Sequence, residues 1–385
     1  MCSRILIDRI EAIVLMMLTE ISSGIPPIIA YSPPTVNDLQ SFADDEAVHE
    51  EAHLADSQES TEHSSGVEER ADPQDSNNPA ESSTSTVHRT SSIDFASQRS
   101  RVKLASVMTT LARVHRLLIS KSSQTRRSLY YELQGGSTAS LAPDQRYVDR
   151  VVHVVANLLE CPSWDLGLLT TAKGLAAGNL VLTLISDDRI NFNSPGGALI
   201  PQIASNVTSL RTRADFVLVV EKDAIFQKLL EQDFPQALNC ILITGKGYPD
   251  VATRMLVKLL STELALPVYA LVDADPFGIE IMCTYRFGSI SNARHQESLA
   301  CPEMQWLGVH PSELFPLGVQ ITQLTTMDIA KLKTLERRSY PIKNLQQELD
   351  ILSRGKAEIE AIAGVSHTFL AKAYIPVKIG AKDFF

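Results

Sequence analysis

The apolar residues in the second half of the chain form short continuous runs, and each run is followed by a segment of helical periodicity. Strands and helices are predicted in the order 216–220, 223–232, 240–244, 249–264, 267–272 and 277–284. Continuous apolar runs of this length are typical of strands buried on both faces. Because strand and helix alternate, we expect an α/β domain with a parallel sheet, right-handed crossovers and flanking helices.

A helical module precedes this domain. Its first helix carries an apolar stripe at helical spacing, formed by Leu104, Val107, Leu111, Val114 and Leu118. A short helix is predicted over 126–133 and a third from Pro143. The apolar runs 166–170 and 180–184 then favour a β-hairpin. Three short helices and a hairpin predict a basic winged helix-turn-helix domain.

The N-terminal part has a different character. Residues 1–20 predict an amphipathic helix that either packs on the protein or docks a partner, and its apolar patch is too short to span a membrane. Residues 21–95 are rich in Ser, Glu, Asp and Pro, so we expect a disordered acidic tail. The winged-helix domain should then cover 96–190. Residues 191–212 look like a linker, and the α/β domain with a C-terminal extension should cover 213–385.

The charge is unevenly distributed along the chain, which has a formal net charge of −10. Residues 38–81 carry 14 Asp and Glu residues and a single basic residue, Arg70. Residues 82–130 instead hold nine Lys and Arg residues against Asp94 alone. Such a basic stretch is a candidate phosphate-binding surface. The five cysteines are scattered without a Cys-x-x-Cys pair, which favours a reducing compartment and disfavours a structural zinc site.

Carboxylates follow two of the predicted strands. Asp273 and Asp275 come after one apolar run, and Glu221 comes directly after another. Residues i and i+2 of an extended segment point to the same side, and the C-terminal edge of a parallel sheet is where such domains place their sites. Hard cations such as Mg²⁺ take oxygen ligands, so these acids are candidate magnesium ligands. The alternative is that Asp275 and Asp223 cap the helices that follow them.

The second candidate group is a tyrosine pair in the basic module. Tyr131 lies one helical turn after Arg127, so the guanidinium and the phenol can reach the same phosphate. Such a phenol can act as a nucleophile toward phosphorus. The alternative is that Tyr130 and Tyr131 are packing or stacking residues. Further candidates for contacts with a DNA backbone are Arg126, Lys173, Lys246 and Arg254.

Five motifs together resemble the family of the topoisomerase VI A chain. They are Arg127-Ser-Leu-Tyr-Tyr131, Leu166-Gly-Leu with Lys173-Gly174 and Gly178, Val220-Glu-Lys-Asp-Ala-Ile-Phe226, Thr244-Gly-Lys-Gly-Tyr-Pro-Asp250 and Asp273-Ala-Asp-Pro-Phe-Gly278. The resemblance extends from about residue 100 to residue 385. Within the family, the chain most resembles the eukaryotic meiotic, sporulation-type transesterases that make double-strand breaks.

This resemblance implies a winged-helix domain joined to a Toprim domain, and a type II topoisomerase-like DNA-cleaving transesterase that forms a 5′-phosphotyrosyl link. By position, Tyr131 matches the nucleophile and Arg127 the catalytic arginine. Glu221, Asp273 and Asp275 match the metal acids, with Mg²⁺ as the cofactor. The family usually has an acid where this chain has Ser128.

The resemblance also implies partners and a place in the cell. They are double-stranded DNA, a homodimer in which Tyr131 of one protomer works with the metal site of the other, a partner like the ATPase-type B component of topoisomerase VI and other meiotic break-forming proteins. The chain would act on chromosomes in the nucleus. No Gly-rich nucleotide loop is evident, and 245–247 is too short for a P-loop, so ATPase activity would come from that partner.

Other functions remain open at this stage. The chain could be the A component of an ATP-dependent type IIB DNA topoisomerase. A Toprim nuclease or primase-type enzyme would use the three acids without Tyr131 and without a covalent intermediate. A DNA-binding regulator would use the basic module alone and leave the acids as helix caps.

Overall fold

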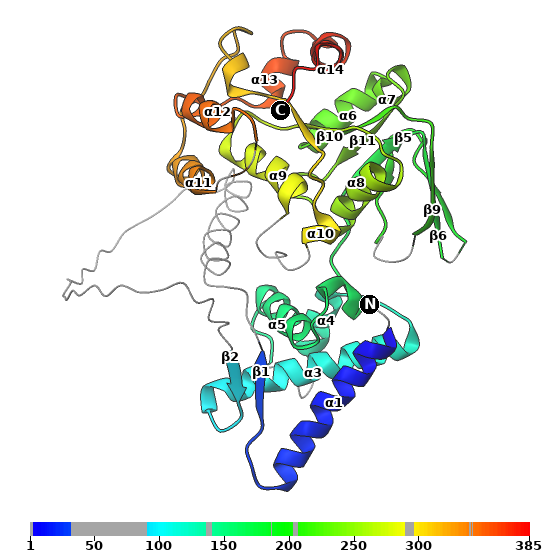
Figure 1. Cartoon of the computed structure of the whole chain (residues 1–385), viewed down its shortest axis with the longest axis vertical. Coiled ribbons are helices and arrows are strands. Elements are labelled where there is room, and N and C mark those ends of the chain that lie inside the picture. Colours follow the sequence, from blue (N-terminus) through cyan, green and yellow to red (C-terminus); the bar gives the residue numbers. More distant parts are fainter. Residues whose placement is uncertain are drawn as a thin grey trace, which may run out of the picture.

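The computed structural model describes most of the chain and arranges it as two bodies, a helical body and a sheet body (Figure 1). The described residues are 3–31, 91–135, 141–185, 187–202, 207–288, 296–338, 340 and 342–385. Within these ranges no helix is long and apolar enough to cross a membrane.

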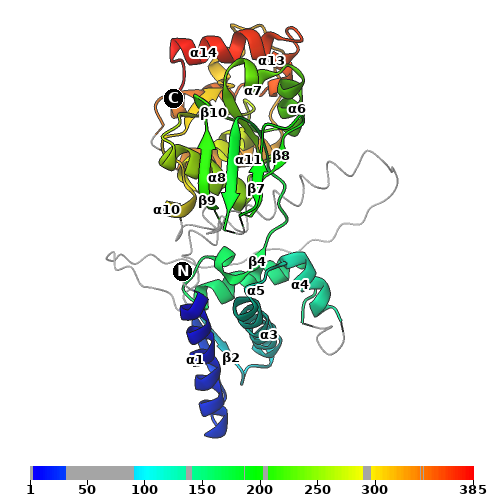
Figure 2. The same ribbon diagram turned by 90° about the vertical axis from the view of Figure 1, so that its right-hand side faces the viewer.

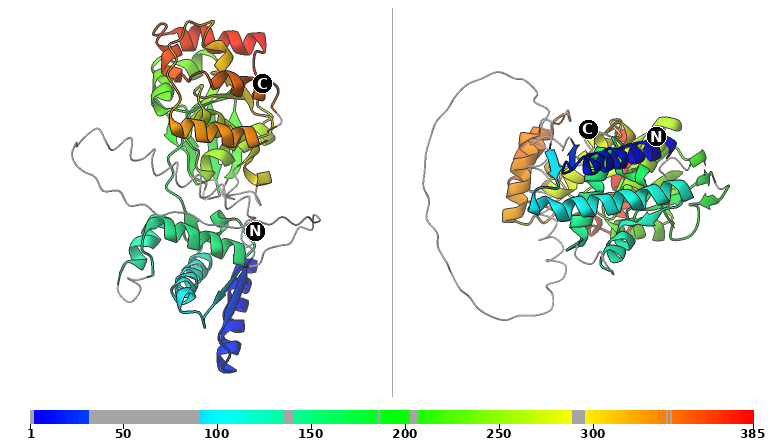
Figure 3. Two further views of the ribbon diagram at one scale, coloured as in Figure 1. Left: turned by 90° about the vertical axis from the view of Figure 1, so that its left-hand side faces the viewer. Right: turned by 90° about the horizontal axis from the view of Figure 1, so that it is seen from below.

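The helical body is built from the N-terminal elements. They are α1 (Ser3–Ser22), β1 (Ile28–Tyr31), β2 (Ser91–Asp94), α3 (Gln98–Ser120), β3 (Gln124–Thr125), α4 (Arg126–Leu133), α5 (Gln145–Leu158), a 3₁₀ helix (Ser163–Leu166) and β4 (Leu168–Leu169). The whole apolar stripe predicted for α3 is buried. It packs against apolar residues of α1, α4 and α5 in one core, and Figure 3 shows α1 beside α3. This hydrophobic stripe therefore organises the body, as its spacing predicted.

A core substitution in α3 tests this arrangement. Leu111 is fully buried, so Leu111→Ala removes apolar contacts and leaves a cavity, with an expected loss of about 2–5 kcal/mol. The measurement is hydrogen exchange of the α3 amides in the full chain, whose opening free energy should fall by that amount. Ile119→Ala is the control on the same helix, since Ile119 is 59% exposed and should cost less than about 1 kcal/mol. Equal losses in the two variants would contradict the packing of α3.

The segment expected to be disordered is shorter than predicted at both ends. Ile28–Tyr31 pairs antiparallel with Ser91–Asp94 in a two-stranded sheet. The side chains of Ile29 and Ile93 are buried in the core of the helical body, which gives these two short apolar segments a place to pack. The prediction over 21–95 was therefore wrong for its two ends, and 32–90 lie outside the described residues.

The hairpin predicted over 166–184 does not form, and the winged-helix prediction is not confirmed. Leu168–Leu169 instead pairs parallel with Gln124–Thr125. The next strands, β5 (Leu175–Gly178) and β6 (Leu180–Leu184), belong to two different sheets of the sheet body. β5 can lie close against its neighbour because it is made of small residues: a Cβ on Gly178 would lie 2.3 Å from the Cys240 carbonyl oxygen. Adjacent apolar runs favour a hairpin locally, but here tertiary packing decides their partners.

The predicted linker over 191–212 is also wrong, because it contains strands. β7 (Arg189–Asn191), β6 and β9 (Val207–Thr212) form an antiparallel three-stranded sheet in the order β7-β6-β9. β8 (Ala198–Leu199) pairs antiparallel with β5 at the edge of the main sheet. The sheet body therefore begins before residue 213, and the linker residues are part of it.

The main sheet has six strands in the order β13-β12-β10-β11-β5-β8. Its central strands are β10 (Phe216–Val220), β11 (Cys240–Thr244), β12 (Val268–Leu271) and β13 (Gln305–Gly308). These four are parallel to their neighbours among themselves, whereas β5 and β8 are antiparallel. The predicted parallel sheet is confirmed for the strands after residue 213 and is extended by antiparallel strands from earlier in the chain.

Helices cover both faces of this sheet. They are α6 (Asp223–Glu231), α7 (Phe234–Ala237), α8 (Val251–Glu263), α9 (Pro276–Phe287), α10 (Gln296–Leu299), α11 (Thr326–Arg337), α12 (Leu345–Leu352), α13 (Ile359–Ala363) and α14 (Ile375–Ala381), with a 3₁₀ helix at Pro311–Glu313 and a π-helical turn at Leu370–Tyr374. Figure 2 shows α14 at the end of the sheet body that lies away from the helical body.

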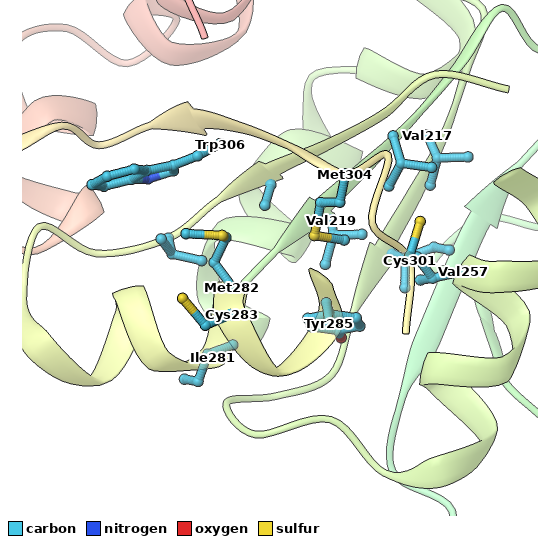
Figure 4. Close-up of a cluster of buried hydrophobic side chains, with 14 of the residues drawn as sticks. Val217, Val219, Val257, Ile281, Met282, Cys283, Tyr285, Cys301, Met304 and Trp306 are labelled. Carbon is cyan, nitrogen blue, oxygen red and sulfur yellow. The ribbon is translucent and has the colours of Figure 1, made fainter. Parts of the chain in front are cut away.

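The two faces of the sheet belong to two separate cores. Along β10, Val217 and Val219 point into the core shared with α8 and α9, whereas Leu218 and Val220 point into the core shared with α6 and α13. Figure 4 shows part of the first core, with Val219 close to Met304. Because both faces are covered, these strands are apolar at every position, and this is why they were visible in the sequence.

Candidate active site

Tyr131 lies on α4, a helix that its sequence holds in one orientation. The Thr125 Oγ1 accepts a hydrogen bond from the Ser128 N–H at 3.0 Å, which caps the helix N-terminus. Leu129 and Leu133, four residues apart, are buried in the core of the helical body. Tyr131 is on another side of the helix and is 58% exposed. Thus α4 is anchored by its leucines and presents this phenol to solvent.

The Tyr131 hydroxyl lies next to a cation. The Arg127 guanidinium donates to the Tyr131 oxygen from Nη2 at 3.3 Å and from Nε at 3.4 Å. Both side chains are exposed. A phosphate that approaches the phenol therefore meets guanidinium donors in the fork geometry that suits phosphate oxygens.

The neighbouring tyrosine has a different environment. Tyr130 packs against the core of the helical body, and its ring centroid lies 5.5 Å from that of Tyr131. Ser128 is exposed, and its backbone N–H serves the helix cap. Of the two phenols, Tyr131 is the one placed at the surface beside Arg127.

Arg126, expected to contact DNA, is instead part of the interior of the helical body. Its Nη1 lies 3.3 Å from the Asp149 carboxylate, and its Nη2 donates to the Ser163 hydroxyl at 2.9 Å. Burial lowers the pKa of this guanidinium, and Asp149 counteracts that effect. The expectation is corrected, because the guanidinium joins α4, α5 and the 3₁₀ helix rather than facing solvent.

The acids after β10 and β12 come together in the sheet body. These strands are parallel neighbours, so their carboxyl ends share one edge of the sheet. The Asp273 backbone N–H donates to the Glu221 Oε2 at 2.9 Å, and both carboxylates are buried. The two residues are 52 positions apart in sequence, and the sheet register joins them.

Asp275 has a second task at this edge. Its Oδ1 accepts a hydrogen bond from the Gly278 N–H at 2.6 Å and so caps α9. A Cβ on Gly278 would lie 2.6 Å from the Asp273 carbonyl oxygen and 2.9 Å from the Glu221 Oε2. The acids and the start of α9 are therefore packed so closely that the motif requires glycine at this position.

The carboxylates raise one another's pKa. Burial raises the pKa of Glu221 well above its usual range, and the charges of Asp273 and Asp275 add to the effect. Burial and Asp275 raise the pKa of Asp273 to about 6. Burial also raises the pKa of Asp275. Like charges held together in a dry place favour protonation or a bound cation, which is the electrostatic character of a cation site.

A lysine missed by the sequence analysis also lies at this edge. The Lys222 ammonium is 2.9 Å from the Asp273 Oδ2 and 3.0 Å from one carboxylate oxygen each of Glu358 and Glu360. The segment that carries these glutamates is tied in place by the Ile359 N–H, which donates to the Asp273 Oδ1 at 2.9 Å. No local motif signals the two glutamates, because only the fold brings them to the acids.

No group of three or more His, Cys, Asp or Glu side chains in the described parts of the chain is arranged to hold a metal ion. At the sheet edge, the oxygens of Asp273 are used by Lys222 and by the Ile359 N–H. The donor set of Glu221, Asp273 and Asp275 nevertheless fits a hard divalent cation, since it is made of oxygens whose repulsion such an ion relieves. Closure around an ion requires these side chains to shift.

Two of the candidate DNA-contacting lysines lie together beside the acids. The Lys173 Nζ donates to the Lys246 carbonyl oxygen at 3.4 Å, and the Lys246 Nζ is 3.0 Å from the Asp223 carboxylate. The loop that carries Lys246 is attached to the acid edge, because the Gly247 N–H donates to the Glu221 carbonyl oxygen at 3.0 Å.

Arg254 requires a correction. It lies on α8 with only 2% of its surface exposed, and burial lowers its pKa to about 10. Helical periodicity placed it on α8, but the sequence alone did not show that its side of the helix faces the core. Arg254 is therefore an interior residue and not a surface contact for DNA.

Two family models match the chain. The model for the Toprim domain shared by the topoisomerase 6 A chain and Spo11 matches residues 216–379, and the model described as "Type IIB DNA topoisomerase" matches residues 102–168. The sheet body thus contains a Toprim domain, whose acid edge is the one described above. The protein is of the class of topoisomerase-like DNA-cleaving enzymes.

Relatives within this class narrow the assignment. The human "Meiotic recombination protein SPO11" is 38% identical over 301 residues, covering 75% of this chain and 74% of the relative. The Drosophila melanogaster "Meiotic recombination protein W68" is 36% identical, with 80% and 91% covered. The A chain of DNA topoisomerase 6 from Arabidopsis thaliana is 33% identical, with 75% and 69% covered. The chain belongs to the family of Spo11 and the topoisomerase VI A chain, as the motifs indicated.

Proposed function

We propose that this protein is a DNA transesterase that makes double-strand breaks and thereby starts meiotic recombination, with Tyr131 as its nucleophile. The observation that carries the proposal is the exposed Tyr131 hydroxyl, 3.3 Å from the Arg127 guanidinium on the body matched by the type IIB topoisomerase model. Two of the relatives described above are named meiotic recombination proteins, which favours this role over that of a topoisomerase component.

The chemistry is an exchange of one phosphate ester for another. The Tyr131 oxygen attacks the phosphorus in line, a P–O bond to tyrosine forms, and the P–O3′ bond breaks. The proton of the phenol is lost, and the 3′ oxygen takes up a proton as it leaves. Arg127 holds the phosphate against the phenol and offsets charge on its oxygens. The product is a 5′-phosphotyrosyl end, and no water molecule enters the reaction.

Glu221, Asp273 and Asp275 would hold Mg²⁺. When bound, this ion supplies positive charge to the scissile phosphate and to the leaving oxygen. The raised pKa values of the three acids support this role, because they reflect negative charge that a divalent cation neutralises. Asp275 also keeps α9 capped, which holds the acids at the end of β12.

The site needs two copies of the chain in this proposal. Tyr131 lies on the helical body and the acids on the sheet body. We therefore infer a homodimer on double-stranded DNA in which Tyr131 of one protomer works at the acids of the other, so that both strands are cut. A partner like the ATPase-type B component of topoisomerase VI and other meiotic break-forming proteins would act with it, on chromosomes in the nucleus.

The deciding experiment asks whether DNA becomes covalently attached to the protein. The purified chain with its ATPase-like partner is incubated with end-labelled duplex DNA and Mg²⁺, then denatured and treated with protease. Label should travel with the protein before proteolysis, the 5′ ends should be blocked and the 3′ ends should be free hydroxyls. Cleavage that leaves free 5′ ends would instead indicate a Toprim nuclease without a covalent intermediate.

We also propose that Lys246 contacts the DNA backbone, because the Gly245–Gly247 loop lies beside the acids and Gly247 has φ +82 with open space around its Cα. Lys246→Ala should weaken DNA binding about equally for all sequences and reduce the slope of log K against log salt by about 1. Lys372→Ala is the control, since Lys372 is exposed on the distant π-helical turn. An unchanged slope for Lys246→Ala would mean that its ammonium serves only the ion pair with Asp223.

A further inference from the structure

The acid edge of the sheet body carries its own cation. The Lys222 ammonium lies about 3 Å from oxygens of Asp273, Glu358 and Glu360, from 2.9 Å to 3.0 Å. These carboxylates differ in depth, because the Asp273 side chain is only 5% exposed whereas those of Glu358 and Glu360 are 68% and 42% exposed. Lys222 therefore joins one buried acid to two acids at the surface.

The Asp273 contact cannot coexist with a metal on the same oxygen. An ammonium and a divalent cation repel each other at hydrogen-bonding distance, and their repulsion is strong where water is excluded. Leaving Asp273 buried and unpaired is also costly, which gives Lys222 a purpose when no metal is bound. The ammonium is carried by a flexible four-carbon stem, and the two glutamates already contact it from the solvent side.

We propose that Lys222 is a built-in counter-cation that competes with the metal for Asp273, and that Glu358 and Glu360 receive its ammonium when the metal binds. The inference rests on the metal role of Asp273 in the proposed function and adds a positioning residue to it. Lys222 then sets how much Mg²⁺ the site requires, because the ion binds only as its ammonium leaves Asp273.

The test is a Mg²⁺ titration of the full chain followed by thermal melting, since an ion that binds the folded state raises the melting temperature with concentration. Lys222→Met keeps the length of the side chain and removes the charge, so it should melt lower without Mg²⁺ and bind Mg²⁺ about tenfold more tightly. Lys222→Gln is a second neutral variant should the Met variant not fold. Lys222→Arg keeps the charge and should bind as weakly as the wild type.

A lysine elsewhere on α6 controls for general electrostatics. The Lys228 Nζ donates to the Ala363 carbonyl oxygen at 3.0 Å, so Lys228→Met removes the same charge from the same helix. Its Mg²⁺ affinity should stay within about twofold of the wild type, because long-range charge effects are largely screened.

The roles of Glu358 and Glu360 are separated by a double-mutant cycle. Glu358→Gln with Glu360→Gln leaves Lys222 held by Asp273 alone and should weaken Mg²⁺ binding about tenfold. In the Lys222→Met background the same two substitutions should have little effect, because the glutamates act through the ammonium. An equal loss in both backgrounds would overturn the part assigned to the glutamates.

The outcomes distinguish this inference from the function on which it rests. A wild-type chain that melts higher with Mg²⁺, together with a Lys222→Met variant of unchanged or weaker affinity, overturns the counter-cation role and leaves the metal site intact. An absence of any Mg²⁺ effect in the wild type and in both neutral variants overturns the metal role of the acids itself.

Discussion

Tyr131→Phe abolishes covalent attachment of the protein to DNA, while folding and DNA binding stay close to those of the wild type. The substitution removes only the nucleophilic oxygen, and the phenyl ring remains beside Arg127, so the surface of α4 is preserved. The measurement is recovery of labelled DNA with denatured protein, with binding of uncleaved DNA as the parallel readout.

Tyr130→Phe is the matched control on the same helix. Its ring packs against the core of the helical body and is retained in the variant, so attachment should remain within a few-fold of the wild type. Attachment that persists in Tyr131→Phe and disappears in Tyr130→Phe would exchange the roles of the two residues. Attachment that persists in both would assign the nucleophile elsewhere.

Glu221→Gln and Asp273→Asn each eliminate Mg²⁺-dependent cleavage. Each substitution removes one buried carboxylate from a set that would hold a largely hydrated ion with few ligands. Both variants should remain folded, because the amide keeps the oxygen that accepts the backbone hydrogen bond from Asp273 or Ile359. Neutralising an acid whose pKa is raised also relieves repulsion, so their melting temperatures should not fall far.

Asp275→Asn should cause only a partial loss. The Asn side chain still offers an oxygen to the Gly278 N–H, so the cap of α9 survives, and only the charge is lost. Cleavage is measured for all three variants with the partner present, over a range of Mg²⁺ concentrations. Normal cleavage by Glu221→Gln or Asp273→Asn, with the fold verified by circular dichroism, would leave these acids as structural residues.

The order of elements in the sheet body was predictable from the sequence. Strands such as Phe216–Val220 are covered on both faces, so they are apolar at every position, and the helices between them keep a one-sided stripe. Acids that directly follow two such strands meet wherever the strands are parallel neighbours. The meeting of Glu221 and Asp273, and the place of Tyr131 four residues after Arg127, therefore follow from local patterns and spacing.

The tertiary structure decided what depends on partners far along the chain. Residues 175–184 have the local character of a hairpin, yet β5 pairs with β11 and β6 with β9, because backbone hydrogen-bonding groups are alike and packing selects among them. Burial of Arg126 and Arg254 depends on neighbours from other elements, and a charged residue type favours the surface by default. Glu358 and Glu360 reach Lys222 only because the chain returns to Asp273 after more than 80 residues. Periodicity carries information about one segment at a time, whereas contacts between distant segments are determined by the packing of the whole chain.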